Sequence, residues 1–120
     1  MSKSKQDFTH LIIWQISHQL VLKVYELTKT FPSEEKFGLT NQLRRAIASI
    51  PSNICEGFGR KSPKEFKQFL YISLGSLEES RYQLLLSRDL SFISNDQYTF
   101  IENKLNVLRI NILSFIKQLS

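Results

Sequence analysis

The chain has 120 residues, of which 42% are hydrophobic and 22% charged, and its formal net charge at pH 7 is +5. This length suits one domain rather than two, and the composition excludes a disordered chain. No apolar run approaches the roughly 18–20 residues that span a bilayer, and no signal-peptide cleavage pattern follows Met1. The sequence therefore predicts a single cytoplasmic domain over residues 1–120, with no membrane segment and with a flexible N-terminus over residues 1–8.

The first predicted helix covers residues 9–29. Ile13, Leu20 and Val24 belong to an apolar stripe whose members recur every three or four residues, which is the period of a helix packed on one side. Residues 30–33 end this pattern, because Pro32 disfavours helical backbone in the residue before it.

The second predicted helix starts at residue 33 or 38 and ends at residue 57. Its apolar line consists of Leu39, Leu43, Ala46, Ile50 and Ile54. Pro51 falls inside this line and removes one backbone hydrogen bond, so the sequence predicts a kink near Pro51. Because the apolar line continues past the proline, we expect one bent helix rather than two helices.

Two serines mark the starts of the third and fourth predicted helices. Ser62 precedes a proline and is followed three residues later by Glu65, which predicts a capping box with proline at the first helical position. Ser94 and Gln97 predict a second capping box. The third helix should end near residue 88 and the fourth near the C-terminus. Short connections favour antiparallel neighbours, so the sequence predicts an all-α, up-down-up-down four-helix bundle.

The sequence contains no recognisable catalytic or metal-binding pattern. His10 and His18 lie eight residues apart, whereas a two-histidine metal pair on a helix requires a spacing of about four residues. Cys55 is the single cysteine and has no histidine partner in sequence, which is typical of a small core residue. We therefore expect no enzyme activity, no metal and no cofactor.

A second, polar stripe follows the predicted second helix beside its apolar line. Such a stripe between the wet and dry faces suits a helix–helix or subunit interface, although it also fits an ordinary solvated face. Glu78 and Glu79 of the third helix are the natural charge partners for its arginine. The stripe consists of Gln42, Arg45, Ser49, Asn53 and Glu56.

A cluster of basic residues surrounds the turn into the third helix. It consists of Arg60, Lys61, Lys64 and Lys67, and in an oligomer Arg44 could join it. Cations grouped in this way neutralise nucleic-acid phosphates without reading sequence. An ordinary solvated turn is the alternative interpretation. The cluster has little aromatic interleaving, so base stacking is not indicated.

Several runs of residues together resemble the family of 23S rRNA intervening-sequence proteins, which includes the accessory variability protein (Avd) of diversity-generating retroelements. These runs are Phe31-Pro32, Phe37-Gly38-Leu39, Gln42-Leu43-Arg44-Arg45-Ala46, Ser49-Ile50-Pro51-Ser52-Asn53-Ile54, Glu56-Gly57-Phe58-Gly59-Arg60, Lys64-Glu65-Phe66, Phe69-Leu70 and Gly75-Ser76-Leu77-Glu78-Glu79. Trp14 also fits the first helix of that family, whereas Cys55 stands where the family commonly has alanine. The resemblance is strongest over residues 37–79 and weakens in the fourth helix.

The resemblance implies a ring-shaped homopentamer of four-helix protomers, with RNA or DNA and a reverse transcriptase as partners. The polar stripe and the two glutamates would then lie at or beside the subunit contacts, and the basic turn would be repeated around the ring. Fold kinship alone does not transfer function, so two hypotheses stay open. One is an oligomeric nucleic-acid-binding accessory protein, and the other is an adaptor whose basic surface binds an acidic partner protein.

Overall fold

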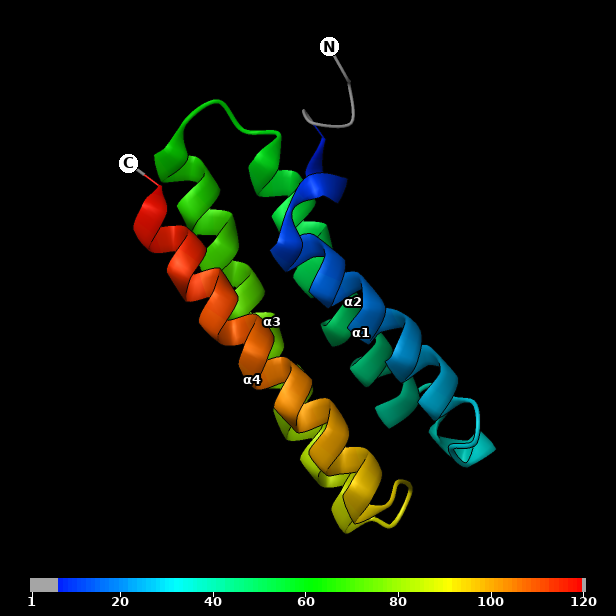
Figure 1. Cartoon of the computed structure of the whole chain (residues 1–120). Helices are drawn as coiled ribbons and strands as arrows, with labels where there is room; N and C mark the ends of the chain where they lie inside the picture. The colour runs from blue at the N-terminus through cyan, green and yellow to red at the C-terminus, as the bar shows by residue number, and fades with distance from the viewer. Residues whose placement is uncertain (1–6, 120) are drawn as a thin grey trace.

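The computed structural model describes residues 7–119 and contains four α-helices and two short 3-10 turns in that range (Figure 1). The helices run alternately up and down, as predicted, and form an elongated bundle of 46 × 24 × 21 Å. No described residue belongs to a β-strand. The predicted flexibility of residues 1–8 falls mostly outside the described residues. Asp7 and Phe8 are described, and they begin the first 3-10 turn.

Helix α1 spans Ile12–Thr28 and begins later than the sequence pattern indicates. The residues before it form the 3-10 turn Phe8–His10, in which the Thr9 amide donates to the capping Asp7 side chain. Leu11 is extended and separates this turn from the helix. The Phe8 ring packs edge-on against Trp14, with ring centroids 5.1 Å apart, and this contact fixes the turn on the first turn of α1.

Helix α2 spans Leu39–Phe58 and passes through Pro51 without interruption. A second 3-10 turn, Ser33–Glu35, precedes it and occupies the earlier of the two predicted start points. Pro51 is buried, and next to it the Ser73 hydroxyl of the following helix donates a hydrogen bond of 2.9 Å to the Ile50 carbonyl. The continuous helix agrees with the sequence analysis, whereas the bend at Pro51 stays a prediction.

Helix α3 spans Pro63–Asp89 and α4 spans Asn95–Gln118. The capping box at Ser94 is confirmed, because its hydroxyl accepts from the Gln97 amide at 3.0 Å and the Gln97 side chain accepts from the Ser94 amide at 2.9 Å. At the start of α3 the box is only half formed. Ser62 accepts from the Glu65 amide, but its hydroxyl, not its amide, donates to the Glu65 carboxylate.

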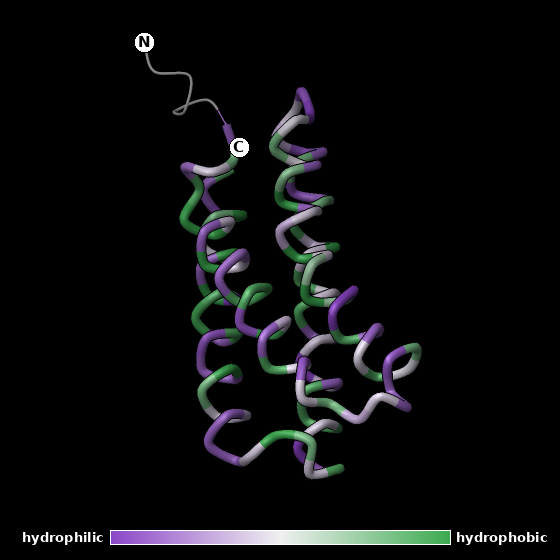
Figure 2. The backbone as a smooth tube through the Cα atoms, turned by 90° about the vertical axis from the view of Figure 1, so that its right-hand side faces the viewer, coloured by the Kyte–Doolittle hydropathy of each residue, from purple (hydrophilic) through white to green (hydrophobic). Residues whose placement is uncertain are grey.

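The core is formed by apolar residues of every helix, which alternate with polar residues along each helix (Figure 2). The predicted line of α2 is buried throughout, whereas Ile16 and Leu27 of α1 are only partly buried. The contact between α2 and α3 is the most extensive of the four neighbouring pairs, and the contact between α1 and α4 is the least extensive. Ser73, Ser80 and Ser87 are fully buried on α3, and the Ser73 hydroxyl reaches the Ile50 carbonyl of α2.

Candidate nucleic-acid and subunit interfaces

The basic turn, residues 59–67, comprises the connection between α2 and α3 and the first residues of α3. Lys61 and Lys64 are exposed and have no ion pair within the described part of the chain. Arg60 is exposed too, but its guanidinium pairs with Glu56 at 2.8 Å and lies 4.8 Å from the centroid of the Phe69 ring. Lys67 is half-buried. Lys61 and Lys64 are therefore the two cations of this turn that are most available to an anionic ligand.

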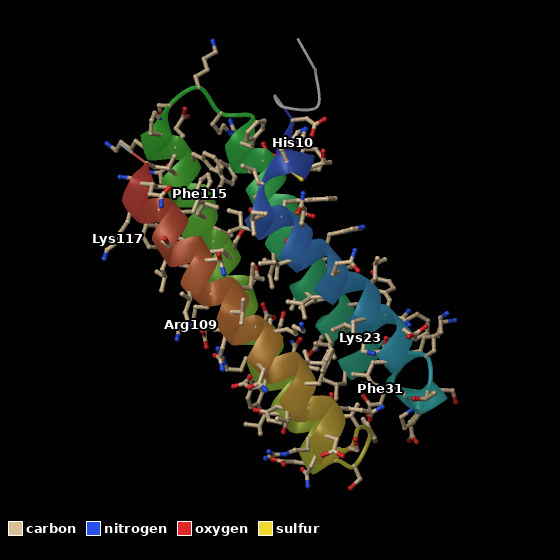
Figure 3. All side chains as sticks on the ribbon, in the orientation of Figure 1. His10, Lys23, Phe31, Arg109, Phe115 and Lys117 are labelled. Carbon is tan, nitrogen blue, oxygen red and sulfur yellow. The ribbon has the colours of Figure 1, made fainter. Side chains whose placement is uncertain are left out.

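The C-terminal end of α4 lies at the same end of the bundle as the basic turn (Figures 1 and 3). This arrangement places the exposed side chain of Lys117 at the basic end, a residue that the sequence analysis did not include. The placement of Lys117 could have been expected from the antiparallel helix order, because this order brings the end of the fourth helix beside the start of the third. The basic end is thus formed by residues from distant parts of the sequence.

Within one protomer the structure separates Arg44 from the basic turn. Arg44 lies in the second turn of α2 and Arg60 lies just beyond the end of this helix, with about 21 Å of helix between Arg44 and Phe58. Arg44 instead crosses to α1, where Nε donates to the Thr28 hydroxyl at 2.8 Å and Nη2 donates to the Tyr25 carbonyl at 3.2 Å. Its guanidinium also lies 4.6 Å from the centroid of the Tyr25 ring. In the protomer, Arg44 therefore links α1 to α2, and it does not contribute to the predicted phosphate-binding set.

The polar stripe of α2 lies along the outer edge of its contact with α3. Gln42, Arg45 and Ser49 line a surface hollow of about 450 Å³ together with Glu79 of α3. Further along α2, the Asn53 amide donates to the Ser49 carbonyl at 2.8 Å and to the Ser49 hydroxyl at 3.1 Å. The structure thus brings most of the predicted stripe and one of the two predicted glutamates onto one surface.

The ion pairs of this region differ from the pairing expected from the sequence. Glu78 lies 3.2 Å from the Arg81 guanidinium, and Glu56 pairs with Arg60. Arg45 is exposed and forms no ion pair with Glu56, Glu78 or Glu79. The sequence pattern places the charges on the same side of the bundle but does not show which of them meet within a protomer.

Arg81 is a structural residue that the sequence analysis missed. Its guanidinium forms a half-buried ion pair with Glu102 of α4 and donates to the Asn106 side chain at 2.8 Å. Glu102 and Asn106 lie on the side of α4 that faces α3, where both side chains contact Arg81. Only the packing of α3 against α4 brings the three groups together.

The two histidines and the cysteine lie outside any metal-binding cluster within residues 7–119. No group of three or more His, Cys, Asp or Glu side chains in that range could hold a metal ion. His18 stacks on Trp14 with ring centroids 4.7 Å apart, and His10 is exposed. Burial raises the pKa of the Cys55 thiol above its ordinary value, so this thiol is a weaker nucleophile at neutral pH than a free one.

The fold and its surfaces define a class of small helical-bundle proteins with a basic end and a polar α2–α3 edge. The chain belongs to the 23S rRNA-intervening sequence protein family, whose model matches residues 9–113. No curated protein matches the sequence. No helix in the described part of the chain is long and apolar enough to cross a membrane.

A solved structure from Bacteroides thetaiotaomicron VPI-5482 has a similar fold. It is described as a protein with unknown function from the S23 ribosomal protein family. The two chains are 24% identical, the alignment covers 89% of this chain and 100% of the other, and the TM-score is 0.79. This likeness supports the four-helix architecture and carries no information on a ligand or partner.

Proposed function

We propose that this protein is a non-enzymatic, self-associating accessory protein of the cytoplasm that binds nucleic-acid phosphates through its basic end. The observation that carries the proposal is the exposure of Lys61 and Lys64 at one end of the bundle, where neither has a carboxylate partner among residues 7–119. Binding of a phosphate backbone requires such uncompensated cations, and it requires neither a pocket nor stacked bases.

Self-association would strengthen this binding. A single turn with a few lysines contributes modest affinity, but copies of the turn held in one assembly act at high effective concentration on one polymer. The polar α2–α3 edge supports the assembly, because Arg45 and Glu79 are exposed there and free to meet charges of a neighbouring subunit. By its resemblance to the family, the assembly is proposed to be a homopentamer.

The test measures binding of labelled single-stranded RNA, single-stranded DNA and duplex DNA by fluorescence anisotropy across a salt series. The variant is Lys61→Gln/Lys64→Gln, and the control is Lys29→Gln/Lys36→Gln, which removes the same charge from exposed residues at the opposite end of the bundle. We expect the wild-type affinity to fall steeply with salt. The variant should bind about tenfold more weakly at low salt and show a smaller slope, whereas the control should not.

Equal losses in the variant and the control would contradict a site at the basic turn. The absence of binding at low salt would contradict the proposal as a whole. Recovery of a partner protein that survives nuclease treatment and depends on Lys61 and Lys64 would instead favour the adaptor hypothesis, in which the same lysines meet an acidic partner, such as a reverse transcriptase.

A further inference from the structure

The outer side of α3 exposes aromatic, aliphatic and acidic side chains that no other helix covers. Tyr71 and Tyr82 are 56% and 61% exposed, and Ile72 between them is 50% exposed. Glu78 and Glu79, which lie between the two tyrosines in sequence, are exposed as well. The α3 outer face is defined here as Tyr71, Ile72, Gly75, Glu78, Glu79 and Tyr82. It points away from the core, because the heptad-spaced serines of α3 are buried on the opposite side.

Gly75 lies in the middle of the α3 outer face, and nothing in the part of the chain that the structure describes requires a glycine there. A Cβ atom at this position would meet no atom within 4 Å, and the backbone does not have a positive φ. Glycine inside a helix is less stable than alanine, so its presence weakens the isolated protomer. Close approach of another molecule between the two tyrosines would explain why this position has a glycine.

The α1/α4 groove, on a different side of the bundle, is open. It is a hollow of about 400 Å³ with Ile16, Leu20 and Phe100 among its lining residues. Lys23 of α1 and Lys104 of α4 place their ammonium groups 5.4 Å from the centroid of the Phe100 ring. Lys23 lies on the side of α1 that faces α4 (Figure 3).

The two lysines of the groove lack an acidic partner. Neither has a carboxylate within 4.0 Å in the described part of the chain. Glu26 and Asp96 line a neighbouring hollow of about 350 Å³, which Lys23 and Phe100 also border, so the acidic residues lie at one end of the groove and Lys104 lies toward the other. The groove therefore combines an apolar floor with two converging cations.

We propose that the α3 outer face of one molecule packs into the α1/α4 groove of a second molecule. The exposed glutamates would meet Lys23 and Lys104, and the aromatic side chains would cover the apolar floor. Tyr71 and Tyr82 are separated by about 16 Å along α3, and the α1 residues that line the two hollows, from Gln15 to Leu27, span about 18 Å, so the face fits the groove in length. A helix lying in a groove between two helices is a common mode of recognition.

This pairing deepens the proposed function, since it rests on self-association and names the surfaces that perform it. The two surfaces are different and lie on different sides of the chain, so the contact is heterologous and passes from head to tail. Repetition of such a contact gives a closed ring when the rotation between subunits permits closure.

The test uses sedimentation velocity of the full chain at micromolar concentration. Lys23→Glu/Lys104→Glu places acids opposite acids, and Glu79→Lys places a base opposite bases, so each variant is expected to sediment as a monomer. An equimolar mixture of the two should associate again, because each variant retains one intact surface. Lys29→Glu and Glu34→Lys are exposed controls outside both surfaces and should assemble as the wild type does.

Gly75→Ala separates the role of close approach from the role of charge. We expect it to raise the melting temperature of the monomeric Lys23→Glu/Lys104→Glu variant, because alanine favours the helix. In the wild-type background it should weaken self-association about tenfold, because the added methyl group holds the neighbouring subunit away.

The outcomes distinguish this pairing from the proposed function. A wild-type assembly that survives both charge reversals, or that is broken by the groove variant alone, overturns the pairing but leaves self-association in place. A wild-type chain that is monomeric overturns both, whereas binding of nucleic acid through Lys61 and Lys64 is measured independently. Capture of an acidic helix from another protein by the groove, without self-association, also overturns the pairing.

Discussion

Gly57 is the residue at which the end of α2 comes closest to the start of α3. A Cβ atom there would lie 2.7 Å from Cδ1 of Phe66 and 2.8 Å from Cβ of Phe69. The ring of Phe66 could turn aside, but the Cβ of Phe69 is fixed to the backbone of α3. The absence of a side chain at Gly57 therefore sets how closely the two helices approach beside the basic turn.

Gly57→Ala should lower the free energy of unfolding by about 1–3 kcal/mol, because the added methyl group overpacks a buried contact. Urea denaturation followed by circular dichroism measures this change. Gly59→Ala is the matched control, since the nearest atom to its Cβ is 3.6 Å away and its φ of −78° suits alanine. A control change beyond about 0.5 kcal/mol, or an unchanged Gly57 variant, would contradict the explanation.

The adjacent residues Arg44 and Arg45 show the limit of prediction from sequence at this scale. The helical period correctly places them on different faces, but it cannot tell that Arg44 reaches the Thr28 hydroxyl and the Tyr25 carbonyl of α1. Those partners are distant in sequence and become available only after α1 and α2 have packed. Lys61 and Lys64 were predictable as exposed, because Lys61 lies in the connection between two helices and Lys64 lies in the first turn of α3, off its apolar stripe.

The end of α3 is closed by a residue with an uncommon backbone conformation. Ser91 has a φ of 66°, and its amide donates to the Arg88 carbonyl at 2.9 Å. The Phe92 amide donates to the Ser87 carbonyl at 2.8 Å, which completes a Schellman motif. The Phe92 ring also packs against Phe31, with centroids 5.4 Å apart. Sequence analysis predicts only a short connection here, because the glycine that usually marks this motif is absent.

Ser91→Gly should raise the free energy of unfolding by about 1 kcal/mol, because glycine adopts a left-handed conformation without the steric cost that serine bears. Thermal and urea unfolding measure the gain. Leu90→Gly, at the preceding residue with a φ of −83°, is the control and should destabilise the fold. A loss of stability in Ser91→Gly would show that the serine side chain has a role that outweighs its backbone strain.

The helices and most of their starts were more predictable from the sequence than the contacts that each helix makes with its neighbours. The Ser94 capping box was found from four consecutive residues, because every group in it is local. The start of α1 was placed too early, because Asp7 caps a separate 3-10 turn whose position depends on the Phe8–Trp14 contact. The buried serines of α3 repeat every seven residues but are polar, so an apolar pattern search does not identify them as core.

At the scale of the whole molecule, the bundle is packed unevenly. The α2–α3 contact is extensive and contains small residues, whereas the α1–α4 contact is limited and leaves an open groove. Regions with fewer buried contacts open at lower free energy than the rest of a domain. The α1/α4 side should therefore be the first part of the bundle to open.

Native-state hydrogen exchange read by mass spectrometry should show faster exchange in peptides of α1 and α4 than in the buried halves of α2 and α3. Measurement on the Lys23→Glu/Lys104→Glu variant removes the protection that self-association through the groove would add. Equal protection of all four helices would contradict uneven packing and would indicate that the bundle opens as one cooperative unit.

The sequence by itself determined the four helices, their antiparallel order and the exposed basic turn, because apolar period, capping and charge are properties of neighbouring residues. Only the tertiary structure decided that Arg44 binds α1, that Arg81 joins Glu102 and Asn106, and that Lys23 and Lys104 converge on Phe100. Each of these contacts joins residues far apart in the chain. Its geometry depends on the rotation and separation of packed helices, which no local pattern specifies.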